Sequence, residues 1–339
     1  MLMKRSIGVV ITSEAITALI CDMALTGKRA FSLKQVPLPD GCISELSGAV
    51  VDISSLQESV ERLLPRVAKW SFADTLIYLV LPERLFDHSS MEIPEKFSGL
   101  RERELLASGI LKLAANSDAN VHGICIDAKG SSKTRRALLV TAREARIQDY
   151  LSIFRREDRF IARVVSPEIA CYQFWRLLRQ EVISKRAILC SAREKLARFE
   201  VWDQGILVDQ WDLSSDLAEQ DLNRGYGATL DISSLHTERL IAKVSEIVNQ
   251  YRERGEPIHE VLLGGGAPAS SAILAALSDE HGIEIISSRS RESILKEQLQ
   301  RFIISEHSCP SEEAIGAAYP EFCNTKSIWR RFGHDKFNT

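Results

Sequence analysis

The chain has 339 residues, of which 45% are hydrophobic and 26% charged, so it falls in the ordinary globular range and can bury a substantial core. A formal net charge of −3 excludes the overall positive field that draws proteins to nucleic acid or anionic lipid. No run of about 18 apolar residues occurs, which argues against a membrane-spanning helix. We expect two domains, or one duplicated domain with an insertion.

The seven cysteines are scattered and form no Cys-x-x-Cys pair, so we interpret them as reduced thiols rather than as zinc or redox ligands. The first residues lead at once into a strand pattern and lack the apolar core of a signal peptide. We therefore expect a cytoplasmic protein, docked at a membrane through a partner.

The chain opens with strand patterns. Residues 7–11 are an unbroken apolar run, and after a polar turn at 12–14 apolar residues alternate over 16–20, as in a half-buried strand. A glycine turn at 26–28 leads to a third strand. Apolar residues at helical spacing over 60–67 then predict an amphipathic helix that covers one face of the sheet.

The middle of the chain has its own order of elements. Strand and helix patterns alternate there, over residues 76–81, 101–113, 121–127, 137–141, 143–155 and 161–165. This β-α-β-β-α-β order is that of a ferredoxin-like subdomain, which we expect at residues 76–165. Ser166 and Pro167 then predict the start of a new helix with a capping serine.

The plan of the first strands returns about 180 residues later. Strand, polar turn, strand, glycine turn and strand follow one another over residues 187–190, 191–195, 197–201, 203–205 and 206–211. A second amphipathic helix is predicted around residues 240–251. Two copies of one plan indicate a duplicated architecture rather than two unrelated domains.

A triple glycine is the strongest chemical signal in the sequence. Gly264, Gly265 and Gly266 follow an apolar strand at 261–263 and precede a predicted helix at 271–281. Glycine lets a backbone approach a phosphorylated ligand closely, and the helix N-terminus behind it favours anions. The segment indicates either a nucleotide contact or tight packing without a ligand.

These segments together resemble the actin-like ATPases. The resemblance is carried by the strand at 7–11 with its turn, the repeat at 187–190, the glycine segment at 262–267 and a helix pattern at 314–318. The insertion is similar to that of the PilM proteins of type IV pili, and to the cytoplasmic part of GspL from type II secretion. The resemblance implies an α/β class: a duplicated actin-like (RNase H-like) fold with an inserted ferredoxin-like subdomain.

The resemblance also implies a division into four parts. A first actin-like subdomain takes residues 1–75 and 166–186, the inserted subdomain 76–165, and a second actin-like subdomain 187–320. Residues 321–339 form a mildly basic stretch that we interpret as a flexible C-terminal tail.

The two phosphate turns depart from the family pattern. Family members that use ATP carry Asp-x-Gly in each turn, where this chain has Val10-Ile11-Thr12 and Cys190-Ser191-Ala192. Both turns thus lack the hard oxygen ligands that hold magnesium, and hydrolysis depends on that ion. The resemblance therefore implies a degenerate ATPase without catalytic residues or a metal site, with ATP bound but not efficiently hydrolysed, or no cofactor.

The resemblance implies a few nucleotide contacts: Ser13, Gly264, Gly265 and Gly266. Arg193, in the second turn, either supplies a charge to phosphate or is an exposed turn residue. Glu14 and Glu194 lie close to the turns in sequence. If either acid reached the phosphates, the chain would instead be an active ATPase or a small-molecule kinase of the same superfamily.

By resemblance to PilM, we expect a cytoplasmic scaffold of a type IV pilus or type II secretion platform, peripheral to the inner membrane. Such a scaffold grips the N-terminal cytoplasmic segment of a bitopic, PilN-like membrane protein beside the inserted subdomain, and an assembly ATPase is a further expected partner. Nucleic acid is not an expected partner. A filament former like FtsA is a third interpretation, but the residues after Lys326 are too few and too polar for the amphipathic membrane helix of such proteins.

Overall fold

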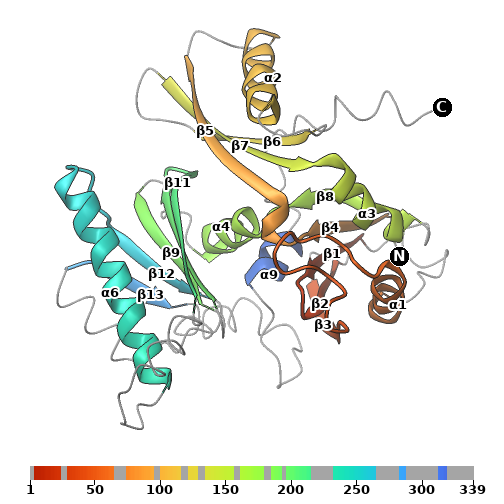
Figure 1. The fold of residues 1–339 in the computed structure, drawn as a ribbon. Coiled ribbons are helices and arrows are strands. Elements are labelled where there is room, and N and C mark those ends of the chain that lie inside the picture. The colour runs from red at the N-terminus through yellow and green to blue at the C-terminus, as the bar shows by residue number, and fades with distance from the viewer. Residues whose placement is uncertain are drawn as a thin grey trace. The chain divides into compact units, whose positions relative to one another are not determined.

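The computed structural model describes residues 4–23, 29–64, 74–94, 100–115, 121–128, 134–155, 161–178, 185–192, 196–214, 232–264, 282–287 and 312–318. They belong to two compact units, each described separately below. Unit 1 comprises Met1–Leu178 and Leu299–Thr339, and unit 2 comprises Arg179–Gln298. Figure 1 shows the elements of both units.

The main sheet of unit 1 has the strand order β3-β2-β1-β4-β8. β1 pairs with β2 in antiparallel and with β4 in parallel orientation. The two central strands contain unbroken apolar runs, at 7–11 in β1 and 76–80 in β4, because both faces of the sheet are covered there. The strands are β1 (Lys4–Ile11), β2 (Ala15–Met23), β3 (Arg29–Pro37), β4 (Asp74–Val80) and β8 (Ile161–Val165).

Four helices pack around this sheet in two pairs, α1 with α3 and α4 with α9 (Figure 1). Asp52 caps α1 by accepting hydrogen bonds from the amides of Ser54 and Ser55, at 3.0 and 3.1 Å. The amide of Ile169 donates to Ser166 Oγ at 3.5 Å, which confirms the predicted capping serine of α4. The helices are α1 (Ile53–Leu63), α3 (Glu144–Arg155), α4 (Pro167–Leu178) and α9 (Glu312–Ala318).

Helix α9 lies so close to its neighbours that two glycines are required. A Cβ on Gly8 of β1 would stand 2.5 Å from the Ala314 carbonyl oxygen, and a Cβ on Gly316 would stand 2.0 Å from the Ala170 carbonyl oxygen of α4. This packing corrects one predicted boundary. The segment around 314–318 was assigned to the second actin-like subdomain at 187–320, but it completes unit 1.

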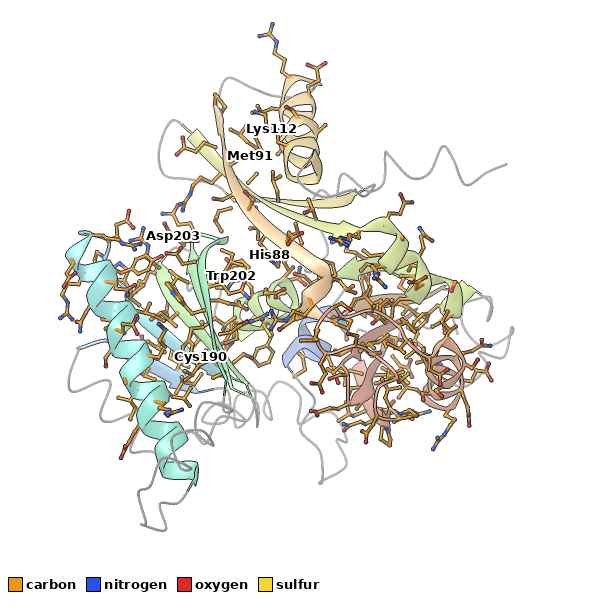
Figure 2. All side chains as sticks on the ribbon, viewed as in Figure 1. His88, Met91, Lys112, Cys190, Trp202 and Asp203 are labelled. Carbon is orange, nitrogen blue, oxygen red and sulfur yellow. The ribbon has the colours of Figure 1, made fainter. Side chains whose placement is uncertain are left out.

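The inserted subdomain is a three-stranded sheet of order β5-β7-β6 with one helix, α2. Its core holds Ile93, Leu106, Ala137 and Leu139, with Met91 packed against α2 (Figure 2). The elements are η1 (Glu83–Leu85), β5 (Phe86–Pro94), α2 (Leu100–Ala115), β6 (Val121–Ala128) and β7 (Thr134–Arg143).

The predicted β-α-β-β-α-β order at residues 76–165 is therefore wrong in its outer strands. β4 and β8 pair with each other in the main sheet and not with the insert. The strand that takes their place is β5, which the sequence did not reveal because its stretch FDHSSMEIP lacks a clear alternation of apolar and polar residues. The insert has the order β-α-β-β.

The sheet of unit 2 repeats the arrangement of the first, with the order β11-β10-β9-β12-β13. β9 pairs with β10 in antiparallel and with β12 in parallel orientation, as β1 does with β2 and β4. This correspondence confirms the duplicated α/β architecture. The elements are β9 (Arg186–Ala192), β10 (Leu196–Asp203), β11 (Ile206–Ser214), α6 (Ile232–Glu253), β12 (Glu260–Gly264) and β13 (Glu284–Ser287).

Helix α6 covers one face of this second sheet, and its predicted apolar stripe is confirmed. The buried core contains the stripe residues together with Ile188, Phe199 and Val261 of the strands. The stripe is Leu240, Val244, Ile247, Val248 and Tyr251. The predicted helix at 271–281, Val67 of the first stripe and the tail at 321–339 lie outside the described residues.

Candidate functional site

The first predicted phosphate turn joins β1 to β2 and is closed by Thr12. Its amide donates to the Ala15 carbonyl at 3.0 Å, and its hydroxyl donates to the same carbonyl at 3.1 Å. The hydroxyl also accepts from the amides of Glu14 and Ala15, at 3.3 and 3.1 Å. Three of the backbone donors that a phosphate would need are thus engaged inside the turn.

The position of the expected first carboxylate is apolar and buried. Val10 is 5% exposed and lies in β1 between Thr17 of β2 and Val80 of β4. Glu14, which the alternative enzyme hypothesis would use, has an exposed side chain in the turn, next to the half-buried Ser13. A magnesium ion prefers carboxylate and water oxygens, so the buried end of β1 does not fit a magnesium–nucleotide complex.

In unit 2, the described residues bring the glycine segment next to the second turn. Gly264 ends β12 and stands beside Ser191 of β9 in the parallel register. Cys190, at the position of the second expected carboxylate, is 1% exposed inside the sheet (Figure 2). Arg193, Gly265 and Gly266 lie outside the described residues, as does Glu194.

Neither a metal-binding cluster nor a membrane-spanning helix occurs in the described ranges. Within these ranges, no group of three or more His, Cys, Asp or Glu side chains is arranged to hold a metal ion. No helix in the same ranges has the length and apolar content needed to span a bilayer. Within the described residues, Cys21, Cys42, Cys171 and Cys190 are buried and form no disulfide.

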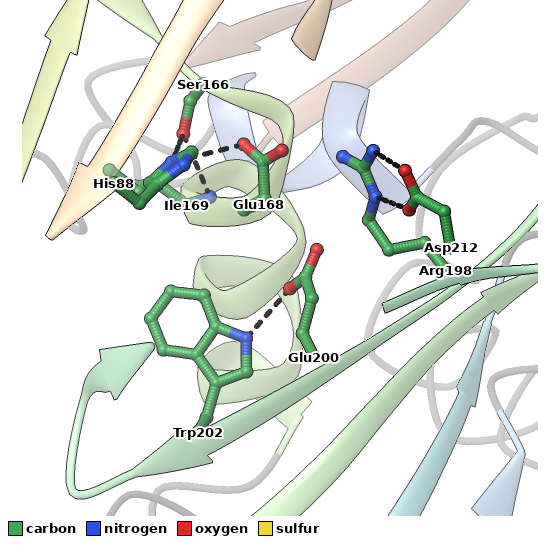
Figure 3. A network of polar contacts seen from close by, with 8 residues as sticks. All are labelled: His88, Ser166, Glu168, Ile169, Arg198, Glu200, Trp202 and Asp212. Carbon is green, nitrogen blue, oxygen red and sulfur yellow. Dashed lines mark hydrogen bonds and ion pairs between the residues drawn. The ribbon is translucent and has the colours of Figure 1, made fainter. Parts of the chain in front are cut away.

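A histidine contact that the sequence did not reveal joins the insert to helix α4 (Figure 3). His88 of β5 lies with Nε2 3.3 Å from Ser166 Oγ and 3.4 Å from Glu168 Oε2. Glu168 is 2% exposed and Ser166 is fully buried. Ser166 and Glu168 lie 78 and 80 positions after His88, so no local spacing could have indicated the contact.

The geometry of this histidine contact is not that of a catalytic triad. In a triad, the nucleophile and the acid approach opposite ring nitrogens, so that the acid orients the imidazole while the other nitrogen takes the proton. Here Ser166 and Glu168 both approach Nε2 of His88. The contact therefore anchors the first strand of the insert to the N-terminus of α4.

Comparison with solved structures places these features in a known fold. The chain superposes on a chain of the PilM–PilN type IV pilus biogenesis complex with a TM-score of 0.65, at 13% identity, covering 92% of this chain and 97% of the other. The chain has the fold of PilM. No family model matches the sequence, and no curated protein sequence does.

Two further structures overlap with the PilM-like fold more loosely. The cytoplasmic domain of EpsL, an inner-membrane component of the Vibrio cholerae type II secretion system, gives a TM-score of 0.40 at 12% identity, with coverage of 82% and 94%. A Bacteroides thetaiotaomicron protein with an actin-like ATPase fold and unknown function gives a TM-score of 0.43 at 10% identity. The match covers 84% of this chain and 91% of the other.

The second half of this PilM-like fold carries buried polar side chains on β10. Arg198 pairs with Asp212 through two contacts of 2.8 and 3.2 Å, and Trp202 Nε1 donates to Glu200 at 2.8 Å (Figure 3). Arg198, Glu200 and Trp202 alternate with core residues of the strand, yet each is under 10% exposed. The alternation was visible in the sequence, whereas the burial of its polar face was not.

Proposed function

We propose that this chain is a cytoplasmic scaffold of a type IV pilus or type II secretion assembly platform. It would bind the N-terminal cytoplasmic segment of a bitopic, PilN-like membrane protein and be held at the inner membrane by that partner. The observation that carries the proposal is the fold shared with PilM over 92% of the chain, in a structure solved as a complex with PilN. An assembly ATPase would be a further partner.

The inserted subdomain offers a physical means of holding such a segment. Among the described strands, β5 and β6 each pair with β7 alone, so both are edges of their sheet. An extended peptide added at a sheet edge is held mainly by backbone hydrogen bonds and needs few diagnostic side chains. We therefore place the partner's segment beside the insert.

The ATPase motifs are, in this proposal, degenerate. The closed turn at Thr12 and the buried Val10 and Cys190 support this, because neither turn offers a carboxylate at the position where the family holds magnesium. A nucleotide bound without turnover would contact the glycine segment and the turns. Its proposed contacts are Ser13, Arg193, Gly264, Gly265 and Gly266.

A pull-down from the native host tests the scaffold role. The tagged chain is purified in mild detergent, and the proteins that come with it are identified by mass spectrometry. We expect a single-span inner-membrane protein together with a pilus or secretion ATPase. Recovery of soluble metabolic proteins alone would instead support an ATPase or small-molecule kinase of the same superfamily.

A further inference from the structure

The loop between β3 and α1 carries most of the exposed large apolar side chains of the described residues. We refer to residues 38–53 as the β3–α1 loop. Leu46 is 92% exposed, Val51 67% and Ile53 40%, and the fourth such side chain, Val208 at 39%, belongs to unit 2. Apolar side chains gathered on one stretch of exposed surface, with polar residues around them, mark sites that bind other chains.

The charge around these apolar side chains has one sign. Residues 35–61 contain no lysine or arginine, and the nearest cations in sequence, Lys34 and Arg62, flank the stretch. Its five acidic side chains are all exposed: Asp40, Glu45, Asp52, Glu58 and Glu61. A ligand of this surface should therefore combine apolar side chains with positive charge.

One of these charges is fixed at the start of α1. Asp52 accepts a hydrogen bond from the Ser55 hydroxyl at 2.7 Å and another from the Ser55 amide at 3.1 Å. The hydrogen bond from the hydroxyl, followed by that from the amide, lowers the pKa of the Asp52 carboxyl group. Asp52 therefore stays ionised near neutral pH, between the exposed Val51 and Ile53.

The β3–α1 loop has a defined backbone conformation. The amide of Ser44 donates to the Ala49 carbonyl at 2.9 Å, and the amide of Gly48 donates to the Ser44 carbonyl at 2.7 Å. Ile43 and Val50 form an isolated antiparallel bridge at the base of this turn. A surface fixed before binding loses little conformational entropy when a ligand docks.

The base of the turn packs where the insert begins. Tyr150 of α3 donates its hydroxyl to the Gly48 carbonyl at 2.7 Å. A Cβ on Gly48 would stand 3.1 Å from the Leu85 side chain and 3.2 Å from that of Pro82. Phe86, the next residue, starts β5, which is an edge of its sheet among the described strands. A peptide laid along β5 would therefore have one end close to the loop.

The partner proposed above supplies the chemistry that this surface requires. In a single-span inner-membrane protein, the short cytoplasmic stretch next to the span carries an excess of lysine and arginine, and Trp and Tyr are enriched at the membrane interface beside it. Such a stretch offers both cations and apolar side chains. The lipid surface itself is a poor ligand, because the anionic headgroups of the cytoplasmic leaflet would face the five acids.

We propose that the β3–α1 loop binds the basic stretch that joins the partner's N-terminal segment to its membrane span. Leu46, Val51 and Ile53 would take the apolar side chains of this stretch, and the surrounding acids would take its lysines and arginines. The inference rests on the proposed function, and it adds a second contact to the one at the insert.

A weak surface suffices because the two contacts are linked. Exposed ion pairs are individually weak and are screened by salt. The basic stretch continues the same chain as the segment on the insert, so the first contact presents it to the loop at an effective concentration on the order of 1 mM. A loop contact with a dissociation constant near that value would already be half occupied, and salt should weaken it.

Model peptides test the surface without reference to the partner's identity. A short labelled peptide of lysine and leucine is titrated with the whole chain by fluorescence anisotropy, beside a lysine–serine and a glutamate–leucine peptide of the same length. We expect the lysine–leucine peptide to bind at least about tenfold more tightly than either of the others, and high salt to weaken it. Leu46→Ser combined with Val51→Ser should weaken this binding about tenfold.

The matched control is Val208→Ser, which changes an exposed apolar side chain on β11 of unit 2 and should bind the lysine–leucine peptide as the unchanged chain does. The double variant should unfold thermally as the unchanged chain does, because both of its substituted side chains are exposed. Equal peptide binding by the double variant and the unchanged chain would overturn the proposal. Binding of anionic lipid vesicles that the double variant loses would overturn it in favour of a lipid surface.

The partner's own sequence separates this inference from the proposed function. The peptide is the cytoplasmic segment of the co-purifying single-span protein, extended to its membrane span. Tight binding by the unchanged chain, with binding about tenfold weaker by the double variant, would support both claims. Equal binding by the two chains would leave the proposed function in place and overturn the role of the loop. Absence of binding by either chain would overturn the proposed function and this inference together.

Discussion

Gly316→Ala should strongly destabilise unit 1. The new Cβ would stand 2.0 Å from the Ala170 carbonyl oxygen and 3.1 Å from the Phe174 amide nitrogen, and both belong to the backbone of α4. Backbone of a packed helix cannot rotate away as a side chain can, so α9 must move off α4. We expect a loss of about 3 kcal/mol or more and a fall in Tm of about 6 °C or more.

The control for this prediction is Gly109→Ala in α2. Its Cβ would also meet close atoms, at 2.9 Å, but these are the side-chain ends of Leu139 and Met91, which can shift. Replacing a helical glycine by alanine gains up to about 1 kcal/mol of helix propensity, which offsets much of that strain. Thermal unfolding followed by circular dichroism should show a small change for Gly109→Ala. Equal stability of the two variants would contradict the close α9–α4 contact.

Val10→Asp should fail to create an ATPase and should destabilise the protein. The substitution places a carboxylate at a site that is 5% exposed, in a central strand between Thr17 of β2 and Val80 of β4. An unpaired buried carboxylate costs several kcal/mol, so we expect a loss of about 3 kcal/mol or more. Phosphate release from magnesium-ATP should stay at background, because the amides of the turn remain engaged by Thr12.

Val10→Asn separates charge from shape in this experiment. Burial raises the pKa of a carboxyl group, so the charge penalty is present at neutral pH and disappears as the pH falls toward about 4. The two variants should differ most in urea-unfolding free energy at neutral pH and converge in acid. Strong magnesium-dependent hydrolysis by the unmodified protein would show that the motifs are not degenerate. Hydrolysis gained only by Val10→Asp would show that the missing carboxylate alone disables the turn, and would contradict the role given to the hydrogen bonds of Thr12.

The repeated part of the fold could be predicted because its signals are local. An apolar run, a polar turn, an alternating strand and a glycine turn occur in both halves, and the sheets they form have the same strand order. The stripe from Leu240 to Tyr251 likewise marks one face of α6 and lies in the core. Each of these inferences needs only the period of a strand or a helix.

The insert and the end of unit 1 were mispredicted because their partners are distant in sequence. Local pattern shows that residues 161–165 form a strand, but pairing with β4 is a tertiary choice. The return of α9 to β1 joins Ser6 to Ala318, which no spacing reveals. At the site, the sequence itself shows that both turns lack a carboxylate. The hydrogen bonds by which Thr12 closes its turn depend on the folded backbone and could not be predicted from the sequence.

Direct titration of the purified chain with its partner's segment tests the scaffold claim most sharply. A labelled peptide of the N-terminal cytoplasmic segment of the co-purifying single-span protein is followed by fluorescence anisotropy, beside a shuffled peptide of equal composition. The account predicts saturable binding of the native peptide and no saturable binding of the shuffled peptide. Adding magnesium-ATP should leave the binding of the native peptide unchanged. Absence of saturable binding up to about 1 mM, where about 4 kcal/mol of binding energy would be visible, would contradict it.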